Sequence, residues 1–297
     1  MKFSSISEIA KKWGVSERSV RDYCAKGRVI GAYLEGKTWR IPEEAKKPTR
    51  QTRHPHKLPS LLDVLKREKE AGIKGGIYHR LQIDMTYNSN HMEGSTLTHD
   101  ETRFIYETKT IGVAEKAMKI DDIMETVNHF RCIDLVIDSA KRKLSEPFIK
   151  QLHLLLKTNT EDSRKPWFHV GDYKALPNTV ADRETTPPEE VKEAMRSLLT
   201  DYNKKQRHSF EEIVEFHAKF EEIHPFQDGN GRVGRLIALK ECLHNDIVPF
   251  LILDEKKMFY YRGLANWKQD HAWLLETCLD GQDLFKRYLD TYRIAYK

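Results

Sequence analysis

A short glycine-rich loop between two segments of helical periodicity constrains the fold of this chain more than any other stretch. It reads His-Pro-Phe-Gln-Asp-Gly-Asn-Gly-Arg-Val-Gly-Arg over residues 224–235. Before it, apolar residues recur at steps of three and four from Phe210 to Ile223, which is the spacing of a buried helical face. A second such pattern begins at Val233. Because Pro225 disfavours the helical conformation of the residue before it, the first helix is expected to end at the histidine.

The residue types in this loop are those of an anion-binding site. The first backbone N–H groups of a helix lack partners within the helix, and they face a ligand together with the positive end of the helix dipole. Arg232 and Arg235 are neighbours on one helix face and can each fork onto a phosphate group. Asp228 offers a hard oxygen ligand for Mg²⁺, and His224 has a pKa suited to taking a proton from a hydroxyl. The pattern predicts transfer of a nucleotidyl or phosphoryl group.

Two other metal sites share parts of this pattern. Glu221-x-x-His224 is half of a di-iron helix motif, but no second copy appears in the chain. An EF-hand loop needs an acidic ligand where Phe226 stands. Neither alternative explains the two arginines.

The loop also matches, at every specified position, the signature His-Pro-Phe-x-Asp-Gly-Asn-Gly-Arg-x-x-Arg, so the chain resembles the Fic family over about residues 59–297. Fic proteins are α-helical enzymes, most of which move AMP from ATP onto a hydroxyl of a target protein. The resemblance implies a mainly α-helical fold with a β-hairpin flap over the active site, His224 as the catalytic residue and Asp228 as the Mg²⁺ ligand. It places ATP against Asp228, Gly229, Asn230, Gly231, Arg232, Val233, Gly234 and Arg235.

A second stretch, Ser89-Asn90-His91-Met92-Glu93-Gly94, is similar to the inhibitory motif of this family. In the family, its glutamate reaches the second arginine of the signature and keeps the γ-phosphate of ATP from seating productively. The resemblance therefore implies that Glu93, supported by Ser89, pairs with Arg235. The alternative is an ordinary carboxylate at a helix end.

Two further segments are expected to contact the nucleotide. Residues 167–180 are rich in β-favouring types and resemble the Fic flap, whose strand edge can hold a target segment by main-chain pairing. Met258–Leu264 resembles the family's Tyr-Tyr-x-x-Leu, whose aromatic rings flank the adenine, although core packing would equally explain these tyrosines. The residues assigned to ATP in this way are Val180, Ala181, Asp182, Arg183, Tyr260 and Tyr261.

The positive charge of the chain is concentrated at its N-terminus. Residues 1–58 hold 14 Lys and Arg against 6 Asp and Glu, whereas the remainder holds 36 against 39. This asymmetry indicates an acidic partner for the N-terminal segment alone, with nucleic acid as the obvious one.

The N-terminal pattern is that of a helix-turn-helix. A capping box at Ser5 opens one helix, Gly14 ends it, and a second helix runs from about residue 17 to Lys26. A hairpin follows over residues 29–42, and the whole resembles winged domains of the MerR/excisionase type. A basic protein-docking module is the alternative. Contacts to DNA are expected from Arg18, Ser19, Arg21 and Lys26.

These observations predict three parts and a cellular setting. Residues 1–45 are expected to form the winged helix-turn-helix, 46–58 a linker, and 59–297 the Fic domain with its inhibitory helix. The longest apolar run, Ile247–Leu253, contains Pro249 and is too short to span a membrane. There is no secretory signal, and the four cysteines form no close pair. A cytoplasmic protein is therefore expected.

The expected function is that of a protein adenylyltransferase, which moves AMP from Mg-ATP to a Ser, Thr or Tyr hydroxyl of a target protein, this protein itself included. Glu93 would inhibit it by pairing with Arg235. Three alternatives stay open: removal of AMP by the same site, another nucleotide donor, and a DNA-binding regulator whose Fic part senses nucleotide. Whether the chain forms a homodimer is likewise left open.

Overall fold

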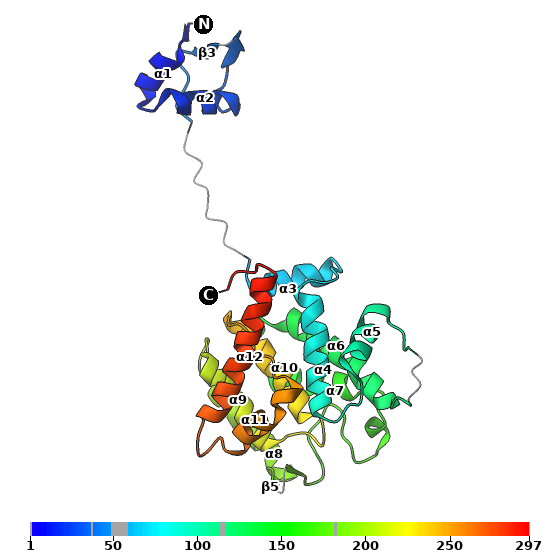
Figure 1. Ribbon diagram of the computed structural model, residues 1–297. Helices are drawn as coiled ribbons and strands as arrows, with labels where there is room; N and C mark the ends of the chain where they lie inside the picture. Colours follow the sequence, from blue (N-terminus) through cyan, green and yellow to red (C-terminus); the bar gives the residue numbers. More distant parts are fainter. Residues whose placement is uncertain (1, 37, 49–58, 113–116, 181–182, 297) are drawn as a thin grey trace. The chain divides into compact units, whose positions relative to one another are not determined.

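The structure is a computed structural model that describes residues 2–36, 38–48, 59–112, 117–180 and 183–296. The chain divides into two units, Met1–Lys57 and Leu58–Lys297 (Figure 1). Most of the predicted linker, residues 49–58, lies outside the described residues. The two units are described separately below.

The N-terminal unit contains two short helices and a small antiparallel sheet. Helix α1 (Ile6–Trp13) begins with a capping box between Ser5 and Glu8, and α2 (Glu17–Ala25) is capped by Ser16. Strands β1 (Phe3–Ser4), β2 (Tyr33–Glu35) and β3 (Thr38–Pro42) pair in the order β1-β3-β2. The two helices and the β2–β3 hairpin lie where the sequence pattern predicts them, whereas β1 was not predicted. The interpretation of the unit as a winged helix-turn-helix stays a prediction.

The larger unit is mainly helical, as predicted (Figure 1). Its only strands among the described residues are β4 (Thr179–Val180) and β5 (Arg183–Glu184), which pair antiparallel. Two 3₁₀ turns, η1 (Asp162–Arg164) and η2 (Asp254–Lys256), also occur. The helices are α3 (Leu61–Glu70), α4 (Ile77–Met92), α5 (His99–Thr108), α6 (Ile120–Ser139), α7 (Glu146–Lys157), α8 (Pro188–Tyr202), α9 (Phe210–Ile223), α10 (Asn230–Asn245), α11 (Lys257–Ala265) and α12 (Ala272–Thr291).

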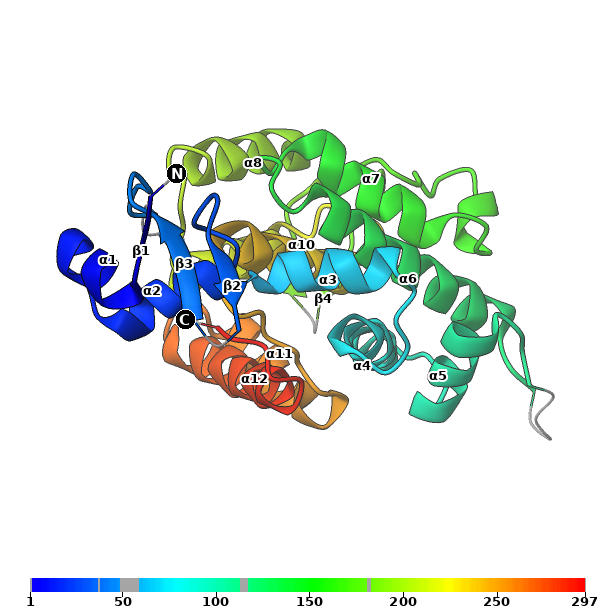
Figure 2. The ribbon, with the colours of Figure 1, turned by 90° about the horizontal axis from the view of Figure 1, so that it is seen from above.

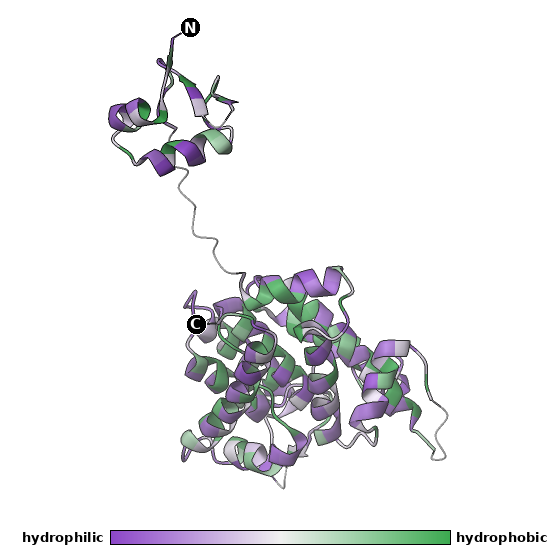
Figure 3. Ribbon diagram, turned by 45° about the horizontal axis from the view of Figure 1, so that its top comes forward, coloured by the Kyte–Doolittle hydropathy of each residue, from purple (hydrophilic) through white to green (hydrophobic). Residues whose placement is uncertain are grey.

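Helix α10 lies at the centre of this unit. It contacts α4, α6, α7 and α9, and it is enclosed by helices in both ribbon views (Figures 1 and 2). Nearly all of its residues are buried, including Val233, Leu236 and Ile237, because a helix covered on every side needs no polar face. Buried apolar residues of α10 and of the surrounding helices form one core cluster, and Figure 3 shows hydrophobic segments, in green, along the helices of this unit. The start of α10 is therefore positioned from several directions at once.

Aromatic packing anchors the loop that precedes α10. Phe226 is fully buried, and its ring stacks on His153 of α7 with centroids 4.0 Å apart and planes 10° apart. Phe220 of α9 and Tyr173 also lie against it, with ring centroids at 6.4 and 6.0 Å. The loop is thereby fixed between α7 and α9. Among the described residues no helix is both long and apolar enough to span a bilayer.

Gly263 in α11 provides a test of this packing. A Cβ atom there would lie 2.7 Å from the Cα and 2.8 Å from the N of Leu274 in α12. Alanine normally stabilises a helix relative to glycine by up to about 1 kcal/mol, but here the clash is with backbone, which cannot move aside. We expect Gly263→Ala to lower the free energy of unfolding by about 1–3 kcal/mol, measured by urea denaturation.

Gly112→Ala is the matched control, because the nearest atom to its added methyl group is Phe104 Cε1 at 3.5 Å, an ordinary contact. Equal stability of Gly263→Ala and the wild type would contradict the close approach of α11 and α12.

Candidate active site

His224 occupies the C-terminal cap of α9. Its backbone is left-handed, with φ 52° and ψ 61°, and its N–H donates to the carbonyl of Phe220 at 3.0 Å. Pro225 explains this ending, since it disfavours helical geometry at the residue before it. The helix thus stops where the sequence predicts. The imidazole is held at a fixed helix end, beside the loop that leads into α10.

The pKa of His224 is lowered to about 4, first by burial and then by the positive charge of Lys174. Its imidazole is therefore neutral near pH 7 and keeps a lone pair for a proton. Its Nδ1 atom is buried and has no hydrogen-bond partner among the described residues. A neutral, partly buried imidazole is the form that a general base requires.

Lys174 was not predicted from the sequence as a site residue. Its N–H donates to the carbonyl of Pro225 at 2.9 Å, which ties residues 167–180 to the loop. Its Nζ donates to Asn178 Oδ1 at 2.7 Å and to Thr185 Oγ1 at 2.5 Å. Burial lowers the pKa of Lys174 to about 8, because these partners are neutral oxygens.

The N-terminus of α10 has no side-chain cap. Gly229, with φ 82°, precedes the helix, and the side chain of Asn230 turns back instead to clasp the loop. Asn230 Oδ1 accepts from the N–H of Phe226 and its Nδ2 donates to the carbonyl of Phe226, both at 2.8 Å. Asn230 thus braces the loop. The N–H of Val233 donates to the carbonyl of Gly229 at 3.0 Å, and the Val233 side chain is buried in the core. An anion at this turn would therefore bind the backbone N–H groups that precede Val233.

The structure brings Arg235, Ser89 and Glu93 together. Arg235 Nη2 donates to Glu93 Oε1 at 2.7 Å and to the carbonyl of Ser89 at 3.0 Å, while its Nε donates to Ser89 Oγ at 2.9 Å. The contact spans 142 residues of sequence, and the guanidinium is only 5% exposed. The pairing that the resemblance implies is thus present as a contact, while its inhibitory role stays a prediction.

Gly231 and Gly234 make room for these polar side chains. A Cβ atom at Gly231 would lie 2.3 Å from Glu93 Oε1, and one at Gly234 would lie 2.4 Å from Glu221 Oε1 and 2.9 Å from His217 Cε1. Both glycines therefore permit close approach to α10. The absence of a side chain at each glycine leaves space for a carboxylate beside α10, that of Glu93 at Gly231 and that of Glu221 at Gly234.

A buried polar cluster lies behind Arg235. His217 Nε2 is 2.7 Å from the hydroxyl of Tyr260, and Arg235 Cζ lies 5.8 Å from the Tyr260 ring. Burial lowers the pKa of His217 to about 3. Burial also raises the pKa of Glu221 to about 8, although the positive charge of Arg235 favours a lower pKa there. His217 Nδ1, Glu221 Oε1 and Arg235 Nη1 are buried without hydrogen-bond partners among the described residues. Sequence reasoning missed His217, which carries only the periodicity of a core residue.

Arg232 has a different environment from the one predicted. It is 3% exposed and pairs with Glu125 of α6 and, through Nη2, with Asp228 Oδ2 at 3.1 Å. Lys157 of α7 donates to the same Asp228 oxygen at 2.7 Å and to Glu125 Oε1 at 2.6 Å. Neither Glu125 nor Lys157 was predicted, because no local pattern links positions so far apart.

Asp228 meets the chemical requirements of a metal ligand. Its side chain is 46% exposed, and although burial would raise its pKa, Arg232 and Lys157 hold that pKa below its ordinary value. The carboxylate is thus ionised near pH 7. Among the described residues, no group of three or more His, Cys, Asp or Glu side chains is arranged to hold a metal ion. Mg²⁺ needs only one or two carboxylates when a substrate phosphate supplies further ligands.

The predicted nucleotide contacts around the flap are only partly brought together. Val180 and Arg183 pair in the β4–β5 hairpin and are exposed, and Arg183 Nη1 donates to the carbonyl of Ala265 at 2.5 Å. Ala181 and Asp182 lie outside the described residues. Residues 167–178 hold no strand, so the predicted β character of this stretch was too broad.

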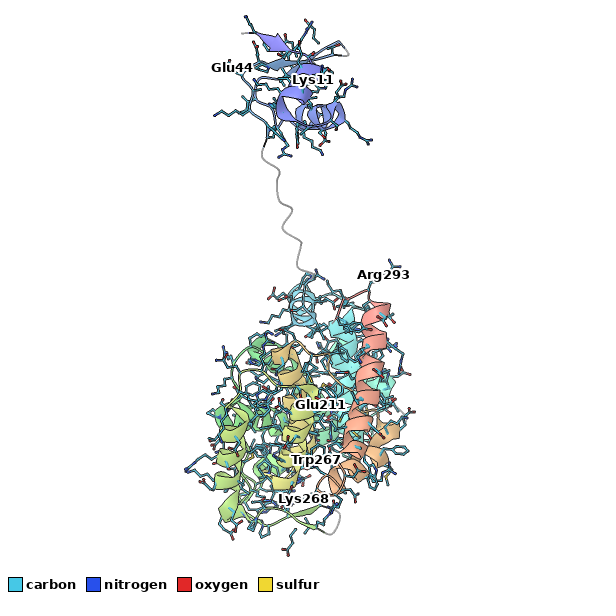
Figure 4. The ribbon with its side chains drawn as sticks, turned by 90° about the vertical axis from the view of Figure 1, so that its left-hand side faces the viewer. Lys11, Glu44, Glu211, Trp267, Lys268 and Arg293 are labelled. Atoms are coloured by element: carbon cyan, nitrogen blue, oxygen red, sulfur yellow. The ribbon has the colours of Figure 1, made fainter. Side chains whose placement is uncertain are left out.

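The two tyrosines of α11 differ. Tyr260 is fully buried beside His217, as the core-packing alternative implied. Tyr261 is 37% exposed, and its hydroxyl donates to the carbonyl of Met92 at 3.1 Å. Lys268, which follows α11 in the chain and is labelled in Figure 4, forms an ion pair with Glu222 near the end of α9, with Nζ and Oε1 2.5 Å apart. Of the two tyrosines, Tyr261 is the one whose ring has exposed surface that a ligand could contact.

Residues 143–242 match the sequence profile of the Fic/DOC family. These residues are therefore similar to a Fic/DOC-family domain. The chain is 24% identical over 181 residues to a protein named "Protein adenylyltransferase Fic" from Nematostella vectensis, which covers 60% of this chain and 41% of that protein. It is 26% identical over 209 residues to the protein of the same name from Drosophila grimshawi, which covers 68% and 39%. The chain thus spans about two fifths of the length of these relatives.

Similarity in structure supports the fold. The crystal structure of a Fic domain containing signaling protein from Bacteroides thetaiotaomicron aligns with a TM-score of 0.62 and 23% identity. The alignment covers 80% of this chain and 99% of that chain. The helical arrangement around α10 is therefore that of Fic domains.

The buried carboxyl of Glu221 gives a test of the site's electrostatics. Its pKa rises from 4.5 in the unfolded chain to about 8 in the fold, so the folded protein holds the extra proton between these values. Stability then falls as the pH rises through this window. Glutamine mimics the protonated acid, and we expect Glu221→Gln to gain thermal stability over the wild type from pH 5 to pH 9, measured by thermal melts.

Glu276→Gln on the exposed face of α12 is the control and should show no such trend. A difference between Glu221→Gln and the wild type that is the same at every pH would contradict a proton held in the fold.

Proposed function

We propose that this protein is a protein adenylyltransferase that moves AMP from ATP onto a Ser, Thr or Tyr hydroxyl of a target protein. One observation carries the proposal: a neutral imidazole, His224, ends α9 in the loop that leads to the uncapped N-terminus of α10, and α10 carries the buried Arg235. The Fic/DOC profile and the relatives named as adenylyltransferases support AMP as the transferred group. Either feature alone would be compatible with other phosphate chemistry.

The proposed reaction uses few groups of this chain. The phosphates of ATP bind the free amides at the start of α10 and Arg235. Asp228 would hold Mg²⁺, which withdraws charge from the phosphates when bound. His224 accepts the proton of the target hydroxyl as its oxygen bonds to the α-phosphorus, and the bond from that phosphorus to pyrophosphate breaks. Because His224 is neutral above about pH 4, it is ready to accept a proton throughout the physiological range.

Glu93 is proposed to inhibit this reaction. Its carboxylate takes the Arg235 Nη2 donor that a terminal phosphate would otherwise use. A phosphate displaced from this arginine turns the α-phosphorus away from the attacking hydroxyl, and misalignment of this kind removes most of the rate advantage of a bound substrate. The protein is therefore expected to be poorly active until Glu93 leaves Arg235.

Removing Glu93 gives the most direct test. With α-labelled ATP, full-length Glu93→Gly is expected to label itself or a target at least ten-fold more than the wild type, because Arg235 becomes free for phosphate. Adding His224→Ala should abolish the label through loss of the proton acceptor. Glu93→Gln, which keeps the shape and loses the charge, should fall between wild type and Glu93→Gly.

Failure of Glu93→Gly to transfer label, or equal labelling by the Glu93→Gly/His224→Ala protein, would contradict the proposal. The same pair of proteins, given pre-modified target, also separates transfer from removal of AMP. Faster removal by the wild type than by Glu93→Gly would favour a de-AMPylase in which Glu93 orients a water molecule.

We further propose that the N-terminal unit binds DNA. Arg18, Arg21 and Lys26 are exposed along α2, within the segment that carries the positive charge of the chain. Such side chains contribute to affinity mainly through phosphate contacts and release of counterions. Ser19 shares a hydrogen bond with Ser16 at 2.9 Å and Lys26 pairs with Asp22 at 2.7 Å, so the two arginines are the stronger candidates.

Binding of duplex DNA by the full chain should decrease steeply with salt. We expect Arg18→Ala/Arg21→Ala to weaken binding at 0.1 M salt at least ten-fold and to reduce the slope of log affinity against log salt by about 2, one unit for each lost phosphate contact. Fluorescence anisotropy with a labelled duplex measures both quantities.

Lys74→Ala/Lys192→Ala removes the same charge from exposed positions of the larger unit and is the control. An equal loss of affinity in both double variants would indicate a general charge effect and exclude a DNA-binding face on α2.

A further inference from the structure

Lys157 occupies an unusual position at the end of α7. Its side chain is only 2% exposed, and its ammonium contacts three carboxylates from separate elements. Nζ lies 2.6 Å from Glu125 of α6, 2.8 Å from Asp162 of η1 and 2.7 Å from Asp228 of the loop. Oxygens of three carboxylates thus converge on a cation that belongs to the protein itself.

The charges in this cluster are balanced by the protein itself. Arg232 pairs with Glu125 and with Asp228, and Lys165 Nζ pairs with Asp162 at 2.7 Å. Three acidic side chains thus meet three basic ones.

Asp228 is the point where this cluster meets the candidate active site. Its Oδ2 atom accepts from both Lys157 and Arg232, at 2.7 and 3.1 Å. A divalent ion bound to this carboxylate would meet two cationic side chains and would compete with them for the same oxygen. The side chain of Lys157 packs against the loop, because a Cβ atom added at Gly229 would lie 3.8 Å from Lys157 Cδ.

We propose that Lys157 is a positioning residue, a tethered cation that holds Asp228 in place of a metal ion and so weakens divalent-cation binding at this site. It does not touch the reacting atoms. It fixes the direction of the Asp228 carboxylate and supplies charge that a metal would otherwise supply. The inference rests on the proposed function only in taking Asp228 as the metal ligand.

Binding of Mn²⁺ tests this without any transfer reaction. Free Mn²⁺ is measured by electron paramagnetic resonance with full-length protein and no nucleotide. We expect Lys157→Met to bind Mn²⁺ at least ten-fold more tightly than the wild type, because Asp228 loses its resident cation. Adding Asp228→Asn should remove the gain. Lys165→Met removes an equal charge from the same cluster without touching Asp228, and its affinity should change less than two-fold.

Folding is checked in the same samples. Thermal melts with and without Mn²⁺ should show a larger metal-dependent rise in melting temperature for Lys157→Met than for the wild type. If Lys157→Met does not fold, Lys157→Gln, which keeps polar donors toward the carboxylates, takes its place. Unchanged or weaker Mn²⁺ binding in a folded Lys157 variant, or an equal gain in Lys165→Met, would overturn the inference.

The result is separable from the test of the enzyme. If Glu93→Gly transfers no label while Lys157→Met binds Mn²⁺ more tightly, the proposed function fails and the role of Lys157 stands. If transfer occurs and Mn²⁺ binding does not respond to Lys157, only the present inference fails.

Discussion

The structure depends on the pairing of charges that α10 carries into the core. Arg232 and Arg235 are 3% and 5% exposed, and a guanidinium buried without an anionic partner is strongly destabilising. Each finds its partner on a distant segment: Glu125 on α6 and Glu93 just after α4. These pairs require α4 and α6 to lie against α10, so the contacts that satisfy buried charge also determine which helices surround the loop. Stability and site geometry therefore have one common cause.

The two pairs differ in how readily the carboxylate can leave its arginine. Glu125 lies within α6, is 14% exposed, and is shared between Arg232 and Lys157. Glu93 is the C-cap residue of α4, is 24% exposed, and is followed by Gly94 with φ 95°. A residue at a helix end can leave its partner by local unwinding, whereas one inside a packed helix cannot. We interpret Arg235 as the exchangeable arginine and Arg232 as a fixed support of Asp228.

Local rules predicted the elements well and the buried charge network poorly. Pro225 fixed the end of α9 and the glycines marked the turn into α10, because each acts through its own backbone. The Glu93–Arg235 contact followed from a family motif, not from periodicity. Lys157 and Glu125 left no local signal, since the ion pair of Glu125 with Arg232 spans 107 residues. The β-favouring residues of 167–178 form no strand. In that stretch the N–H of Lys174 donates to the carbonyl of Pro225, so tertiary contact outweighed β-propensity.

Burial beside these fixed charges also sets the protonation of the groups around them. The same desolvation that lowers the pKa of His224 to about 4 raises that of Glu221 to about 8, so both are neutral near pH 7. Neutral His224 keeps the lone pair that a proton acceptor needs. Neutral Glu221 cannot compete strongly for Arg235, although the positive charge of that arginine acts on its carboxyl group. The charged partner of Arg235 is thereby Glu93, at 2.7 Å, and exchange of this one contact for an anion is the step that we propose to control access to the site.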